Sequence, residues 1–205
     1  MLGVLRPKQK GLMLGVSLPK MRRFNARAKI SLRSLLLERM TMLKFYDVEE
    51  NYINYLKKID RQIPDIAYST NNKFVCGIVL DIDGVPYYAP ISHTTKPYRT
   101  SKLIYDKGRP ISSIRFSFMF PAPQSVLTQK NFDQIRAIDP HYADVITAEY
   151  QYCVKNEEDI LQKAKAVYNI GCNKEHAFNY TCCDFKKLEA EYSKYDKTIV
   201  YKTQG

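Results

Sequence analysis

The chain of 205 residues contains no tryptophan and only three histidines. Its five cysteines are odd in number and unevenly spaced, which argues against a disulfide scaffold and favours a reducing compartment. No stretch approaches twenty apolar residues, so the sequence predicts no membrane-spanning helix. The basic first residues lack a compact apolar segment and a small-residue cleavage site, which argues against secretion. We therefore expect a cytoplasmic protein without a membrane partner.

The sequence also lacks a convincing metal motif. Cys172 and His176, followed by Cys182-Cys183, are the one grouping that could suggest zinc. Two CxxC-type pairs are missing, and adjacent cysteines chelate a single ion poorly. We predict no metal and no cofactor.

Acidic residues are scarce in the first part of the chain. Residues 1–41 hold ten Lys or Arg and one acid, whereas residues 42–205 hold 22 basic and 20 acidic residues. The net charge of +11 therefore belongs mainly to a basic N-terminal extension, 1–41, and not to the folded domain expected over 42–205. A nucleic-acid site on that domain has to be a local patch.

The extension contains an internal echo. MLGVLRPKQKGL at 1–12 is followed by MLGVSLPKMRRF at 13–24. Three interpretations stay open: a basic nucleic-acid-binding arm, a transit-peptide-like segment, or upstream DNA translated from an early start codon. We favour the third, because Met40 and Met42 stand just before the first expected strand.

Periodicity and turn residues predict an α+β fold with a compact, strongly curved antiparallel sheet or partial barrel and peripheral helices. Asp47 and Glu50 have capping-box spacing. Asp139-Pro140 marks a helix start, Asn156 starts another helix, and Gly171 ends it. Strands are expected at 43–46, 74–82, 85–90, 103–105, 112–120 and 125–128, and helices at 47–60, 140–153, 156–171 and 184–195.

The most informative stretch is the hairpin that turns at Asp83-Gly84, two residues that tolerate positive φ. If it closes there, its open end brings Lys73 close to the polar loop Ser92-His93-Thr94-Thr95-Lys96. The preceding loop, 61–72, delivers Tyr68 to the same end. Structural roles compete with a chemical one: an edge lysine usually prevents aggregation, and a Ser-His pair usually belongs to a turn.

Four motifs in order resemble one family. LKFYDVEENYINYLKKID at 43–60, GIVLDIDG with YYAPIS at 77–92, FSFMFP at 116–121 and TCCDFKKLEAEY at 181–192 are similar to the ToxN/AbiQ family, including its CptN-like branch. These proteins are the endoribonuclease toxins of type III toxin–antitoxin systems.

The resemblance implies a curved sheet like that of the Kid/MazF toxins. It also implies metal-independent cleavage of RNA to a 2′,3′-cyclic phosphate, and a role in phage defence. The implied partners are substrate RNA and a repeated pseudoknot RNA antitoxin, which inhibits the toxin in a closed protein–RNA hetero-oligomer. Such RNA repeats lie upstream of the toxin gene, so residues 1–24 are interpreted as translated antitoxin repeats.

Site residues follow from the resemblance position by position. Lys73, four residues before Gly77, matches the family's lysine, and Ser92 matches the first hydroxyl after Ala-Pro-Ile. His93 replaces the usual second hydroxyl. Lys96 matches a second lysine with one extra residue between, and Tyr68 matches a tyrosine offset by one.

RNA cleavage through the 2′-hydroxyl needs a proton acceptor, a proton donor and cations for the phosphorane. Lys73 and Lys96 supply positive charge, or one of them acts in its neutral form as the base. Ser92 orients the phosphate, and His93 suits general acid or base work. RNA contacts are predicted for Tyr98, Arg99, Lys102 and Arg115. The alternatives are a non-catalytic RNA-binding protein on this fold and a housekeeping nuclease without an antitoxin.

Overall fold

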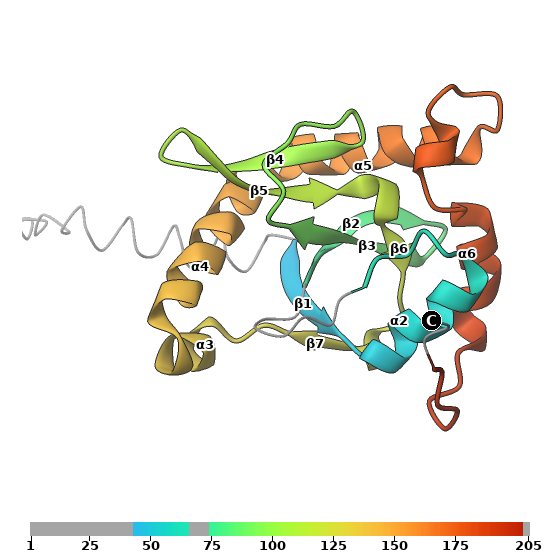
Figure 1. Ribbon diagram of the computed structural model, residues 1–205, viewed down its shortest axis with the longest axis horizontal. Coiled ribbons are helices and arrows are strands. Elements are labelled where there is room, and N and C mark those ends of the chain that lie inside the picture. The colour runs from blue at the N-terminus through green and yellow to red at the C-terminus, as the bar shows by residue number, and fades with distance from the viewer. Residues whose placement is uncertain (1–42, 66–73, 203–205) are drawn as a thin grey trace, which may run out of the picture. The chain divides into compact units, whose positions relative to one another are not determined.

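Seven strands form one antiparallel sheet, which organises the described part of the chain (Figure 1). The computed structural model describes residues 43–65 and 74–202. The strands are β1 (Lys44–Val48), β2 (Val75–Ile82), β3 (Val85–Ser92), β4 (Ser101–Asp106), β5 (Arg109–Arg115), β6 (Phe120–Pro121) and β7 (Leu127–Gln129). Their order is β4-β5-β3-β2-β1-β7, and β6 pairs with β3. The α+β prediction is confirmed, but the sheet is not closed into a barrel, because its two edge strands in the described chain, β4 and β7, do not pair with each other.

The central hairpin forms as predicted. Ile82 pairs with Val85, and the turn residues Asp83 and Gly84 have φ of 53° and 83°. The Asp81 carboxylate accepts a hydrogen bond of 2.9 Å from the Gly84 amide. Two consecutive positive φ values match the twist of the strands, so this local signal sets the register of β2 against β3.

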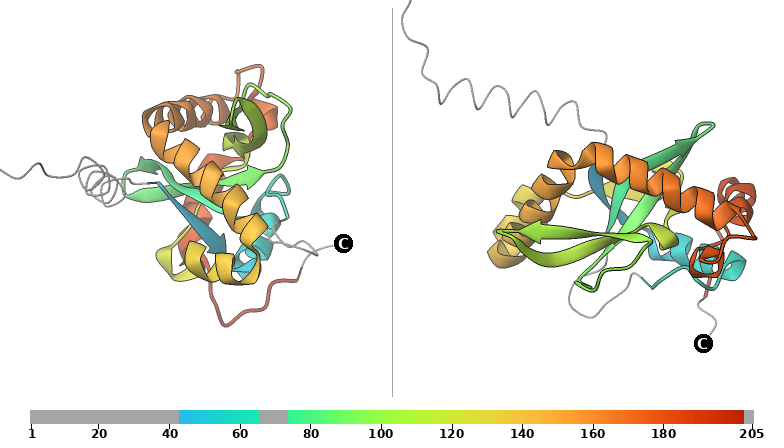
Figure 2. Two further views of the ribbon diagram at one scale, coloured as in Figure 1. Left: turned by 90° about the vertical axis from the view of Figure 1, so that its left-hand side faces the viewer. Right: turned by 90° about the horizontal axis from the view of Figure 1, so that it is seen from above.

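The helices pack against β4, β2 and β6 and against one another (Figure 2). They are α2 (Glu50–Ile59), α3 (Phe132–Ile138), α4 (Pro140–Lys155), α5 (Glu157–Cys172) and α6 (Phe185–Glu191). Asp139 caps α4 as predicted, accepting a bond from the Tyr142 amide. Helix α3 was not predicted from the sequence, although Asn131 caps it by accepting from the amides of Asp133 and Gln134.

Two local predictions were wrong. Asp47 does not cap α2, because it lies within β1 and pairs with Lys130 at 2.8 Å. The strand expected over 112–120 ends at Arg115, and Phe116–Phe118 turn as a 3₁₀ helix. β5 lies between β4 and β3, and even its serines Ser112 and Ser113 are fully buried.

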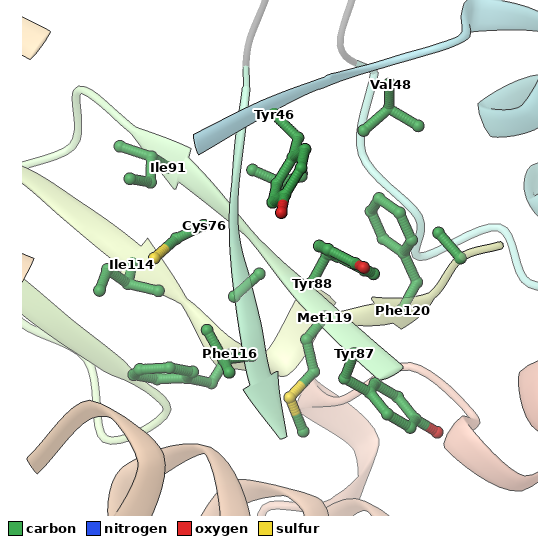
Figure 3. Close-up of a cluster of buried hydrophobic side chains, with 14 of the residues drawn as sticks. Tyr46, Val48, Cys76, Tyr87, Tyr88, Ile91, Ile114, Phe116, Met119 and Phe120 are labelled. Atoms are coloured by element: carbon green, nitrogen blue, oxygen red, sulfur yellow. The ribbon is translucent and has the colours of Figure 1, made fainter. Parts of the chain in front are cut away.

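Aromatic and aliphatic side chains fill the space between the strands and the helices (Figure 3). Gly77 is required at the centre of β2, because a Cβ there would lie 2.0 Å from the Tyr88 ring. Several tyrosines belong to this core and bond through their hydroxyls. Tyr52 donates to the Pro121 carbonyl and Tyr87 to Glu189 of α6. Core packing therefore explains part of the high tyrosine content, sixteen residues in the whole chain.

Candidate functional site

Ser92 is the last residue of β3, held between two neighbouring strands. Ile91 donates its amide to the Phe74 carbonyl at 3.0 Å, and Ser92 pairs with Ser113 of β5. The Ser92 Oγ lies 3.3 Å from the Thr94 Oγ1. The predicted serine is therefore fixed by the sheet, half-buried, with a second hydroxyl beside it.

An exposed basic loop follows Ser92. It carries His93, Lys96, Tyr98 and Arg99, and it rejoins the sheet at Ser101. A turn fixes its end, because the Ser101 amide donates to the Tyr98 carbonyl at 3.2 Å. Residues 84–105 contain no Asp or Glu, and the described residues give this loop no ion pair. Its cations are thus available to an anionic ligand.

Arg115 connects this loop to the sheet. Its guanidinium lies 4.9 Å from the centre of the Tyr98 ring and 4.8 Å from that of Phe118. The Lys96 ammonium lies 5.9 Å from the centre of the same Tyr98 ring. Burial lowers the pKa of the Arg115 guanidinium, but an arginine stays protonated at neutral pH. Lys96, Tyr98 and Arg115, all predicted from the sequence, therefore form one cluster.

Lys102 is placed apart from this cluster. It pairs across the strands with Ile114, whereas its neighbour Ser101 pairs with Arg115. Because side chains alternate along a strand, Lys102 lies on the opposite face of the sheet from Arg115. Its ammonium contacts Asp159 of α5 at 3.3 Å. Its predicted contact with RNA stays a prediction.

Two predicted site residues, Tyr68 and Lys73, lie outside the described residues. The described chain resumes at Phe74, next to the Ile91 amide.

Three aromatic residues near this cluster, Phe118, Phe178 and Tyr180, were not predicted from the sequence. Arg99 lies over the Phe178 ring at 4.9 Å, and Tyr180 is 74% exposed. Together with Phe118 they help to line a pocket beside the basic loop. The sequence gave no signal for them, because no local pattern connects residues 178–180 of the segment HAFNYTCC with residue 98.

One buried carboxylate lies between the sheet and the helices. Glu149 of α4 has no exposed surface, and neither of its oxygens has a hydrogen-bond partner among the described residues. Burial raises its pKa to about 7. The Ser112 hydroxyl lies close enough to oppose this rise, but the geometry is too poor for a hydrogen bond. Glu149 is separate from the Ser92 loop, because Ser112 and Ser113 point to opposite faces of β5.

Within residues 43–65 and 74–202, no group of three or more His, Cys, Asp or Glu residues could hold a metal ion. The five cysteines are free thiols. None of the described helices is long and apolar enough to cross a bilayer.

Two curated relatives of this chain are endoribonucleases. Endoribonuclease ToxN of Bacillus thuringiensis subsp. kurstaki is 24% identical over 162 residues, covering 74% of this chain and 84% of that protein. Endoribonuclease AbiQ of Lactococcus lactis subsp. lactis is 25% identical over 178 residues, covering 80% and 94%.

Solved structures agree on the fold. A type III toxin, studied for its selective inhibition by a non-coding RNA pseudoknot, superposes with a TM-score of 0.72 at 23% identity. The alignment covers 77% of this chain and 99% of that one. The lactococcal anti-phage endoribonuclease AbiQ gives a TM-score of 0.66 at 24% identity, covering 76% and 98%.

The model of the family described as "Toxin ToxN, type III toxin-antitoxin system" matches residues 44–193, most of the chain. The match begins with β1 and ends within the 3₁₀ turn after α6, so it includes the whole sheet and the Ser92 loop. This chain belongs to the ToxN family of type III toxin–antitoxin toxins.

Proposed function

We propose that this chain is an endoribonuclease toxin that cleaves RNA through the substrate's own 2′-hydroxyl, leaving a 2′,3′-cyclic phosphate, without a metal ion. Family membership and the endoribonuclease relatives support the activity. The structural observation that carries the proposal is Ser92 at the end of β3, beside Thr94 and next to a basic loop without carboxylates. A rigid hydroxyl and nearby cations suit a reaction whose main demand is stabilising a phosphorane.

The residues have the following proposed roles. Ser92 orients the scissile phosphate, and Lys73 and Lys96 stabilise its developing charge. His93 exchanges a proton with the 2′ or the leaving 5′ oxygen, and Tyr68 completes the site. Tyr98, Arg99 and Arg115 hold the RNA, with Lys102 as a more distant contact.

The solved relatives support the choice of RNA partners. One solved relative is a toxin inhibited by an RNA pseudoknot, another belongs to an antiviral system regulated by a processed non-coding RNA, and a third is anti-phage. We propose that a repeated pseudoknot RNA restrains this chain in a closed protein–RNA hetero-oligomer, in the cytoplasm, as a phage defence.

The proposal also includes the boundary of the toxin domain and the curvature of its sheet. We place the toxin within residues 42–205, with residues 1–41 unnecessary for cleavage. We also propose that the curvature of the open sheet is related to that of the Kid/MazF toxins.

The test uses the purified full chain and a single-stranded RNA. Wild type should yield a 2′,3′-cyclic phosphate, and one 2′-deoxy substitution at the cleaved nucleotide should block the reaction. Ser92→Ala should lose about 100-fold or more in rate, the effect of removing one stabilising donor. The matched control is Ser112→Ala, a serine on the helix side of β5, which should cleave normally.

Lys73→Ala separates an enzyme from a mere binder. An enzyme should retain much of its RNA affinity while cleavage collapses. A wild-type chain that binds RNA but never cleaves it would instead establish the non-catalytic alternative.

A further inference from the structure

A pocket of about 480 Å³ opens beside the basic loop. Four segments that are distant in sequence line it: Gln62 from the first, and from the others Tyr98 and Arg99, Arg115 and Phe118, and Phe178 and Tyr180. The volume lies within the range of sites that enclose small organic groups. Aromatic rings and guanidinium groups dominate this lining.

Arg115 is the most unusual of these residues. Rings on Tyr98 and Phe118 occupy its surroundings at 4.9 and 4.8 Å. Its Nε is buried and has no hydrogen-bond partner in the described chain. A buried donor without a partner has a free-energy cost, which a ligand acceptor would remove. The guanidinium can only donate hydrogen bonds, so the missing partner is an acceptor.

The aromatic side chains around Arg115 are available from solvent. Tyr98 is 44% exposed and Tyr180 is 74% exposed, whereas most tyrosines of the core are buried. Arg99 lies 4.9 Å from the centre of the Phe178 ring, which gives the pocket a second flat cation–aromatic pair. Flat, partly exposed rings and guanidinium planes are the surfaces on which unpaired bases stack.

The pocket is on the same side of the sheet as Ser92. Ser92 pairs with Ser113, and Arg115 is two residues further along β5 on the same face. Two strand residues span about 7 Å. The pocket is therefore a neighbour of the candidate cleavage site.

We propose that this pocket binds one unpaired nucleobase of the RNA, close to the cleaved bond, with Arg115 donating to an acceptor on the base edge. Tyr98 and Tyr180 stack on the base, and the exposed Lys96 and Arg99 contact the adjoining phosphates. The inference rests on the proposed function and adds a specificity-determining subsite to it. A protein partner fits less well, because the lining combines two guanidinium groups with no carboxylate.

The experiment measures binding of the full chain carrying Ser92→Ala, so that the RNA stays intact. Abasic nucleotides replace, one at a time, each position of a short single-stranded RNA that wild type has been shown to cleave. One position near the cleaved bond should weaken binding about tenfold, the usual effect of losing a stacked base. Tyr180→Ala or Arg115→Gln should weaken binding of intact RNA similarly and make that abasic position nearly harmless.

The control is Tyr105→Ala, a tyrosine of β4 that is 41% exposed but lies outside the pocket. It should leave the abasic effect unchanged. Tyr180 is so exposed that its loss should not disturb folding, which keeps the test decisive if Arg115→Gln folds poorly. An abasic effect that persists undiminished in Tyr180→Ala, or the absence of any sensitive position, would overturn the proposal.

Failure of this inference is distinguishable from failure of the proposed function. A chain that cleaves RNA but shows no coupling lacks the subsite only. A chain that does not cleave would refute the enzyme, while the same scan over the whole RNA still decides whether the pocket holds a base.

Discussion

The two faces of the β4–β5 hairpin differ in what covers them. The helix-covered face, formed by Lys102, Ile104, Ser112 and Ile114, packs against α4 and α5. The loop-side face, formed by Ser101, Ser113 and Arg115, continues across the sheet to Ser92.

Polar groups of each face show the difference. On the helix-covered face, a buried Glu149 faces Ser112, and Lys102 pairs with Asp159. On the loop-side face, the cations have rings beside them and no ion pair with any described residue. The same two strands thus contribute stability through one face and, we infer, RNA chemistry through the other.

The largest expected effect comes from the helix-covered face. Ile104→Ala should lower the free energy of unfolding by about 3 kcal/mol, because Ile104 is fully buried and the change leaves a cavity. Denaturant unfolding measures this loss. Cleavage by the folded protein should change little, since Ser92 is on the other face.

The control is Ile138→Ala, an isoleucine of α3 that is 87% exposed and should barely affect stability. A large loss of cleavage in folded Ile104→Ala would show that the two faces are not independent.

Glu149→Gln should sharpen the contrast through pH. The folded pKa of Glu149 is raised to about 7, above the usual value near 4.5. Between these two values the folded state binds more protons, so stability should fall as pH rises through this window. The full shift corresponds to about 3 kcal/mol as an upper estimate. Glutamine cannot ionise, so the variant should be more stable than wild type at pH 8 and less dependent on pH.

Thermal or denaturant unfolding from pH 4 to pH 8 provides the measurement, with exposed Glu158→Gln of α5 as the control. A variant that is less stable than wild type at pH 8 would show that Glu149 has a partner when ionised.

The smallest effect compares two lysines. Lys96→Ala should reduce the salt dependence of RNA binding. The negative slope of log K against log salt should become shallower by about 0.7, for one lost phosphate contact on a single strand. Lys102→Ala should leave that slope nearly unchanged, because Asp159 pairs with its ammonium. Fluorescence anisotropy over a range of salt concentrations measures both. Equal slopes for the two variants would contradict the assignment of the faces.

The sequence by itself determined the local features. Asp83-Gly84 set the turn, and Asp139-Pro140 set the start of α4, because each depends on a few adjacent backbone dihedrals. The four motifs between residues 43 and 192 were also sufficient to indicate the family.

Only the tertiary structure decided which residues meet. The pairing of Ser92 with Ser113 depends on β5 inserting between β3 and β4, which no local pattern specifies. Lys102 and Arg115 looked equivalent in sequence, yet alternation along paired strands placed them on opposite faces. The pocket needs Tyr180 and Tyr98 in one lining, and these distant segments come together through the packing of α5 and the turn after it.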